Sequence, residues 1–177
     1  MKYPMIQKPP ITVPATLLKP DVLTLITKNF WLNRNDKKYS REGKVLLLLI
    51  RVEKNNERRA LLLMDTFVTL LHYRGHSIDR IYVTMGILID GVEMPFDLRE
   101  TTKRTQDKSG TYSRTEYSPT NIFILKIGRY YPIREWRDGK LKLKFQLTKI
   151  LARLEMDAAV HKEQMERARH FRENYEK

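Results

Sequence analysis

Residues 121–154 limit the possible folds most, because a strand, a turn and the start of a long helix follow one another there. Ile122 and Ile124 stand among β-branched and aromatic neighbours, a composition typical of a half-buried strand. Asp138-Gly139 predicts a tight reversal, since glycine accepts positive φ. Beyond it, apolar residues recur at helical spacing at positions 143, 147, 150, 151 and 154. We expect the remaining elements to pack around this strand and helix.

Three helices are predicted by apolar residues at helical spacing. The first covers residues 21–32, with Asp21 near its positive end. The second lies near residues 56–74, where Asn55 or Asn56 can cap it and Gly75 can end it. The third begins soon after residue 139 and extends as far as residue 175. Lysine and apolar residues alternate in KLKLKF, so the alternative for residues 140–145 is a strand.

Strands are predicted in four further segments: 45–52, 78–84, 87–90 and 92–99. Asp90-Gly91 is a strong hairpin signal between the last two. Pro95 has no N–H to donate, which indicates an edge strand or a bulge. The polar stretch that follows, as far as residue 120, is interpreted as a long basic loop, and loops of that length tend to be functional or disordered.

These elements predict an α+β fold: an antiparallel sheet of about five or six short strands, two main packing helices and a long charged C-terminal helix. A chain of 177 residues suits one such domain. We divide it into a proline-rich lead (1–20), a single α+β domain (21–160) and a projecting charged helix end (161–177).

The chain is strongly basic, with 34 Lys and Arg against 21 Asp and Glu and a formal net charge of +13. Such an excess favours polyanionic partners, although it could also aid solubility or dock an acidic protein. The absence of cysteine excludes disulfides, thiolate zinc sites and cysteine nucleophiles. No apolar run approaches the length that spans a bilayer. We therefore expect a cytoplasmic protein without a membrane partner.

Cations and aromatic rings gather in the long loop and around the turn. Such cations neutralise phosphates, and exposed rings stack on unpaired bases. The predicted nucleic-acid-binding residues are Lys103, Arg104, Lys108, Arg114, Arg129, Arg134, Arg137, Lys140, Lys142 and Lys144. The predicted stacking residues are Tyr112, Tyr130 and Tyr131. Trp136 is better explained as a core anchor. Lysines near the start of a helix oppose its dipole, so an anion or acidic partner would offset them.

The sequence contains no phosphate-binding loop, dinucleotide fingerprint or G-x-S-x-G motif. A metal-dependent nuclease would need carboxylates and a lysine around a cation, and Asp90, Glu93, Asp97 and Lys103 could supply them. However, Asp90 also suits the hairpin turn, and the other two acids suit the solvent side of a strand. His72 and His76 are a poor metal-ligand set. We predict no enzyme activity, no metal and no cofactor, with the nuclease as the less favoured alternative.

Four segments together resemble a family of uncharacterised bacterial proteins. They are the lead ITVPATLLKPD, a strand and helix ending in YRGHSI, the hairpin ILIDGVEMPFDLRE and the turn IREWRDGK before a long charged helix. The resemblance covers most of residues 9–170, and REWRDGK is its most distinctive piece. Members often carry a small helix-turn-helix segment upstream of the lead, which implies a DNA-associated regulator or a mobile-element accessory.

Residues 1–20 contain no helix-turn-helix, so we expect a truncated member or a separately encoded partner. The resemblance supplies no catalytic residues. The expected function is therefore a non-enzymatic accessory or regulatory domain that associates with nucleic acid through a basic surface, or with a DNA-bound partner. The alternative is a protein–protein interaction module in which the long C-terminal helix pairs with another helix.

Overall fold

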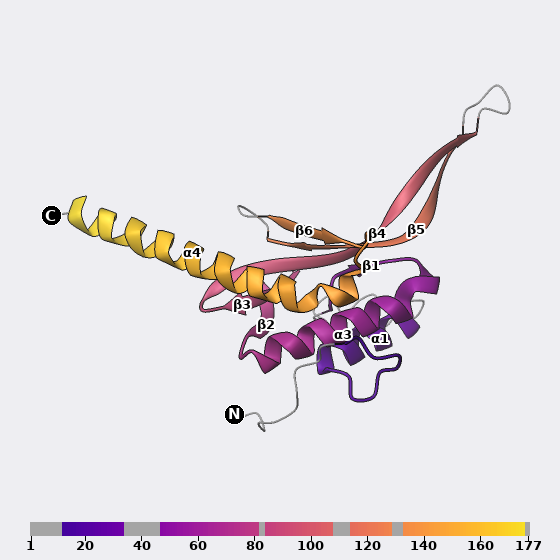
Figure 1. Cartoon of the computed structure of the whole chain (residues 1–177), viewed down its shortest axis with the longest axis horizontal. Coiled ribbons are helices and arrows are strands. Elements are labelled where there is room, and N and C mark those ends of the chain that lie inside the picture. The colour runs from indigo at the N-terminus through magenta and orange to yellow at the C-terminus, as the bar shows by residue number, and fades with distance from the viewer. Residues whose placement is uncertain (1–11, 34–46, 82–83, 108–113, 129–132, 176–177) are drawn as a thin grey trace.

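The structure, a computed structural model, describes residues 12–33, 47–81, 84–107, 114–128 and 133–175. Its helices and strands, in chain order, are α1 (Val22–Leu32), β1 (Ile50–Arg51), α3 (Glu57–Tyr73), β2 (Ser77–Ile81), β3 (Thr84–Ile89), β4 (Val92–Asp107), β5 (Arg114–Ile127), β6 (Arg134–Arg137) and α4 (Leu147–Tyr175). Short 3₁₀ turns precede α3 at Lys54–Asn56 and α4 at Leu143–Phe145. The predicted α+β class is confirmed (Figure 1).

The sheet has the strand order β2-β3-β4-β5-β6, with β1 beside β4. All neighbours along this path are antiparallel, and only the short β1 pairs in parallel, through Ile50 opposite Leu98 and Arg51 opposite Arg99. The helices lie on one side of β4, β5 and β6 (Figure 1). The sheet therefore has an inner face against the helices and an outer face.

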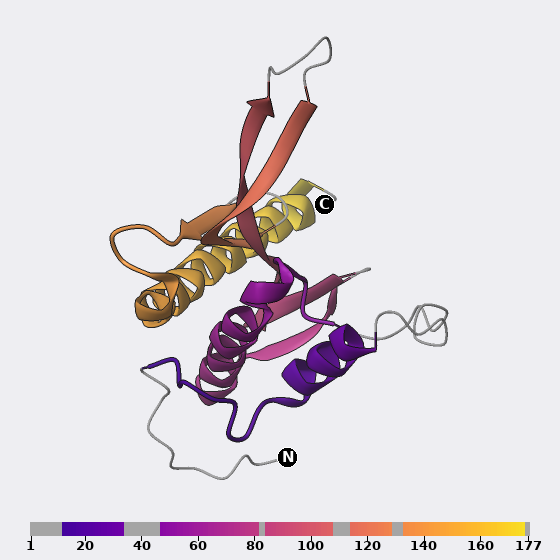
Figure 2. The ribbon, with the colours of Figure 1, turned by 90° about the vertical axis from the view of Figure 1, so that its right-hand side faces the viewer.

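Helix α3 is the centre of the core. Every residue from 60 to 68 is buried, since α1, α4 and the sheet surround this helix (Figure 2). Sheet residues that meet this core include Phe96, Leu98, Phe123 and Leu125, each no more than 2% exposed. The apolar stripe of α4 also packs into this core, and Ile150 within that stripe is fully buried. Burial of this kind of apolar surface is the main source of folding free energy.

The helix predictions agree closely with the structure. Asp21 caps α1 by accepting the N–H of Leu23 at 2.9 Å. Gly75, with φ of +83°, follows α3 and ends it. Residues 140–142 form neither strand nor helix, and residues 143–145 form a 3₁₀ turn, so the strand alternative is wrong and α4, which starts at Leu147, begins later than predicted.

Two predictions about strands were wrong. Of segment 45–52, only Ile50–Arg51 is a strand, because the N–H of Leu48 donates to the hydroxyl of Thr27 on α1 instead of to a neighbouring strand. Residues 45 and 46 lie outside the described part. Pro95 is the last residue of β4 that pairs with β3, and pairing with β5 begins only at Phe96, so, within the described part of the chain, residues 92–95 have a strand partner on one side only, as predicted for an edge. A missing N–H is tolerated at such a change of partner.

The second correction concerns the predicted loop of residues 100–120, because its described residues are mostly strand; residues 108–113 lie outside the described part. Residues 102–107 of β4 pair with residues 114–119 of β5, so most of this stretch forms a two-stranded ribbon. Both faces of this ribbon are exposed to solvent, so polar and apolar residues do not alternate along it as they do in a half-buried strand.

Asp138 occupies the predicted turn but is a buried carboxylate, only 3% exposed. Its Oδ1 accepts the N–H of Leu143 at 2.9 Å, and its Oδ2 accepts the N–H of Phe123 at 3.1 Å and a guanidinium N–H of Arg59. Gly139 is not among the described residues with positive φ, so the reversal depends on the carboxylate and not on glycine. Asp138 thereby joins β5, α3 and the turn before α4.

Burial acts to raise the pKa of Asp138, but the N–H groups of Leu143 and Phe123 and the Arg59 guanidinium outweigh it, and the pKa lies below its usual value. A carboxyl whose pKa is lowered by folding stabilises the protein above its unfolded pKa of about 4. That contribution is lost as the pH falls through the folded value.

We predict that Asp138→Asn lowers the free energy of unfolding by about 3 kcal/mol at pH 7, because it leaves the partly buried Arg59 unpaired. Urea denaturation at pH 7 and at acid pH measures this loss, which should shrink as the pH falls. Asp79→Asn is the control, since Asp79 is exposed on β2. Equal destabilisation by the two substitutions would contradict the role given to Asp138.

Candidate nucleic-acid interface

The paired residues 102–107 and 114–119, named the arm from here on, extend beyond the body of the protein (Figures 1 and 2). They form six cross-strand pairs, from Thr102 opposite Pro119 to Asp107 opposite Arg114. At about 3.4 Å per residue the arm is about 20 Å long. Its strands continue directly into the buried parts of β4 and β5, so the arm is an extension of the core sheet.

The two faces of the arm differ in charge. Opposed residues of an antiparallel pair share a face, and successive residues alternate. One face, named the Arg104 face, contains no acidic residue and consists of Thr102, Arg104, Gln106, Thr115, Tyr117 and Pro119. The other face places Lys103 opposite Ser118 and Thr105 opposite Glu116. Arg104 is thus a cation directly across from the ring of Tyr117, which is 66% exposed.

A polar cluster holds the base of the arm. The strand register shifts between Glu100 and Thr102, and opposite this shift Asn121 adopts a φ of +58°. Glu100 Oε1 accepts the N–H of Asn121 at 2.8 Å and the side-chain amide of Asn56 at 2.9 Å. Glu100 Oε2 accepts the N–H of Glu53 at 3.1 Å. The cluster connects both strands of the arm to the N-terminal end of α3.

Two further bonds strengthen this base. Arg59 on α3 donates to the carbonyl of Asn121 at 2.8 Å, and its guanidinium lies 4.1 Å from the centroid of the Phe123 ring. Thr120 donates its hydroxyl to the carbonyl of Thr101 at 2.9 Å. Sequence analysis missed Arg59, Glu100 and Asn121. The αL preference of asparagine was the one signal available at Asn121.

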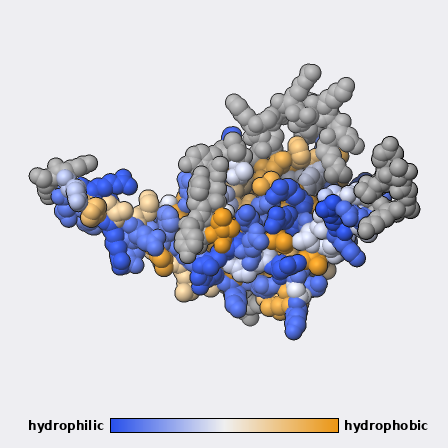
Figure 3. Space-filling view, turned by 90° about the horizontal axis from the view of Figure 1, so that it is seen from above, coloured by the Kyte–Doolittle hydropathy of each residue, from blue (hydrophilic) through white to orange (hydrophobic). Residues whose placement is uncertain are grey.

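The outer face of β4, β5 and β6 carries cations interleaved with acids. Arg51 pairs with Asp97, and Arg99 lies 3.3 Å from Glu135. Lys126 lies between Asp97 and Glu135 in the strand register. Seen from this side, the molecule is largely hydrophilic with small separate hydrophobic areas (Figure 3). This face is therefore less basic than the composition suggests.

The structure distributes the predicted binding residues over several places. Lys103 and Arg104 lie on the arm, and Arg114 belongs to its last described pair. Arg137 is exposed at the end of β6, and Lys140 is exposed in the turn after it.

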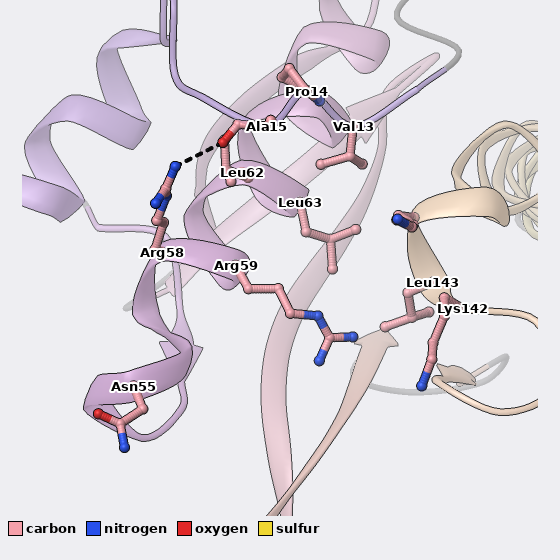
Figure 4. Close-up of a pocket in the computed structure, with 11 residues that line it drawn as sticks. Val13, Pro14, Ala15, Asn55, Arg58, Arg59, Leu62, Leu63, Lys142 and Leu143 are labelled. Carbon is pink, nitrogen blue, oxygen red and sulfur yellow. Dashed lines mark hydrogen bonds between the residues drawn. The ribbon is translucent and has the colours of Figure 1, made fainter.

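Three of the remaining predicted cations have specific surroundings. Lys142 and Lys144 line a cavity together with two arginines of α3 (Figure 4). Arg134 points to the inner face and donates to both oxygens of Asp157 on α4, at 2.9 and 3.1 Å. Because Arg134 joins β6 to α4 through this ion pair, we do not count it among the residues available to bind a nucleic acid.

Five predicted residues lie outside the described part of the chain: Lys108, Tyr112, Arg129, Tyr130 and Tyr131. Trp136 is half-buried on the inner face and packs against the core, as predicted.

The residues weighed for a metal site have other partners or positions. Asp90 occupies the hairpin turn with a φ of +49°, and Asp97 pairs with Arg51. His72 Nδ1 lies 3.3 Å from Asp21, and His76 Nε2 lies 2.8 Å from Glu155. Within the described ranges, no three His, Cys, Asp or Glu side chains lie close enough together to hold a metal ion.

Among the described residues, no helix combines the length and the apolar character needed to cross a membrane. Comparison of the chain with protein-family models, curated proteins and solved structures gives no match.

We predict that Glu100→Ala loosens the arm without unfolding the body, because three hydrogen bonds at its base are lost while the apolar core is untouched. Amide hydrogen exchange should become at least several-fold faster in residues 102–106 and 115–119 and stay unchanged in α3. Glu93→Ala, on the same strand but exposed and outside the cluster, is the control. Unchanged exchange in the arm would show that Glu100 does not hold it.

Proposed function

We propose that the protein is a non-enzymatic accessory or regulatory domain that associates with duplex DNA, and that the arm enters the major groove. The main support is the shape of the arm: two paired strands, about 20 Å long, extend from the core with both faces in solvent. The major groove of B-form DNA is about 12 Å wide and admits a two-stranded β-ribbon.

The side chains of the arm suit this position. Arg104 can donate to guanine or to a phosphate, and Tyr117 beside it offers an exposed ring for apolar contact. Lys103 points to the opposite face, where a phosphate of the groove wall would meet it. The absence of acids from the Arg104 face means that no described side chain on that face repels the phosphates.

The charge of the whole chain supports the same partner. A net charge of +13 attracts a polyanion over several ångströms and speeds association. The groove geometry also favours DNA over double-stranded RNA, since the major groove of A-form RNA is too deep and narrow for protein side chains to read.

A second candidate function, docking to a protein, is favoured by α4. Beyond Ala158 this helix leaves the core and extends away from the body (Figure 1). Its exposed apolar side chains are Met156, Val160, Met165, Phe171 and Tyr175, each more than half exposed. A DNA-bound protein that pairs with α4 would make the two functions compatible.

We predict that duplex DNA binding weakens steeply with salt and that Lys103→Gln/Arg104→Gln reduces this dependence. Each phosphate contact contributes about 0.9 to the slope of log affinity against log salt, so the slope should fall by about 1 to 2. Fluorescence anisotropy with a labelled duplex at several salt concentrations measures it.

The matched control is Lys162→Gln/Arg172→Gln, which removes the same charge from the exposed end of α4. If the control lowers the salt slope as much as the arm variant does, binding depends on the net charge of the chain and not on the arm. No binding at low salt, or binding indifferent to salt, would overturn the proposal and favour the protein-docking function.

Groove choice gives an independent prediction. Duplex DNA should bind at least ten-fold more tightly than duplex RNA of the same sequence, and a dye that fills the major groove should compete while a minor-groove ligand should not. Equal affinity for the two duplexes would exclude insertion of the arm into the major groove.

A further inference from the structure

A cavity of about 610 Å³ lies where three segments meet: the N-terminal half of α3, the chain at residues 13–15 and the turn before α4 (Figure 4). A volume of this size is typical of small-molecule sites. None of its lining comes from the arm.

The described residues of the lining include four cations and no acid. Arg58 and Arg59 come from α3, and Lys142 and Lys144 come from the turn before α4. The arginines are engaged: Arg58 donates to the carbonyl of Ala15 at 3.0 Å, and Arg59 binds Asp138 and the carbonyl of Asn121.

The two lysines differ from the arginines. Both are exposed, and neither has an anionic partner among the described residues. The ammonium group of Lys144 lies 4.8 Å from the centroid of the Phe145 ring. Four positive charges surround the cavity, and the carboxylate of Asp138 is already bound to Arg59, so the potential at the lysines is positive.

The floor of the cavity is apolar. Leu62 and Leu63 of α3 and Leu143 form it, and all three are less than 10% exposed. Val13 and Pro14 add aliphatic wall on the other side. Because these leucines are already almost buried, an occupant would remove apolar surface from water mainly at Val13, Pro14 and Ala15, at about 25 cal/mol per Å².

We propose that this cavity binds a small organic anion that has an apolar body and one phosphate or carboxylate head group. The head group lies between Lys142 and Lys144, and the body covers the aliphatic wall of Val13, Pro14 and Ala15. A neutral molecule would leave the lysines uncompensated, and inorganic phosphate would leave this aliphatic wall in water, so both parts of the ligand are needed. The site is separate from the arm and does not depend on the proposed DNA binding.

The probe for a test is 8-anilinonaphthalene-1-sulfonate, an aromatic anion whose fluorescence rises in apolar surroundings. Titration into the full chain should give saturable binding. Lys142→Gln/Lys144→Gln should weaken it at least ten-fold, because both head-group cations are removed while the floor stays intact.

Two control variants accompany this test. Lys162→Gln/Arg172→Gln removes equal charge from α4, and Lys103→Gln/Arg104→Gln removes it from the arm; both should bind the probe as the unmodified chain does. Circular dichroism confirms that the variants are folded. Retention of DNA binding by Lys142→Gln/Lys144→Gln would separate this site from the proposed function.

Displacement of the probe by matched pairs identifies the ligand chemistry. Octanoate should displace it at least ten-fold better than octanol if the natural head group is a carboxylate, and adenosine monophosphate should exceed adenosine by the same factor if it is a phosphate. The proposal is overturned if the probe does not bind, if the lysine variant binds it as well as the unmodified chain, or if neutral and anionic members of both pairs displace it equally.

Discussion

The ion pair between Asp138 and Arg59 is the interaction on which the arrangement of the other elements depends. A buried carboxylate costs several kcal/mol unless donors surround it, and here every donor comes from a different element. Phe123 belongs to β5, Leu143 to the turn before α4 and Arg59 to α3. Satisfying one side chain therefore brings the sheet and two helices into register, which apolar packing alone specifies less strictly.

The arm and the cavity share this support. Arg59 lines the cavity, binds Asp138 and also donates to Asn121 at the base of the arm. Arg59 thus contributes to both candidate sites. Its planar group with five donors can make such simultaneous contacts, whereas a lysine at this position could not reproduce them.

Helices and strands could be predicted from the sequence where one face of the element is apolar and the other is polar. The helices near residues 21–32 and 56–74 have an apolar stripe, and Asp90-Gly91 has specific turn chemistry, so both were identified correctly. The arm has two wet faces and hence no apolar alternation, which made it resemble a loop. Asp138 resembled a turn residue because its donors lie elsewhere in the chain. The cavity was hidden for a similar reason, since Arg58 and Lys142 meet only after folding.

The attachment of the arm at one end makes it a lever. A force applied near its tip, about 20 Å from the base, produces a torque that the hydrogen bonds of Glu100 and Asn121 must resist. Those bonds end at the N-terminal end of α3, and α3 cannot rotate freely because its residues 60–68 are all buried. Mechanical load on the ribbon is therefore delivered to the first turn of α3, where Arg58 and Arg59 form one wall of the cavity.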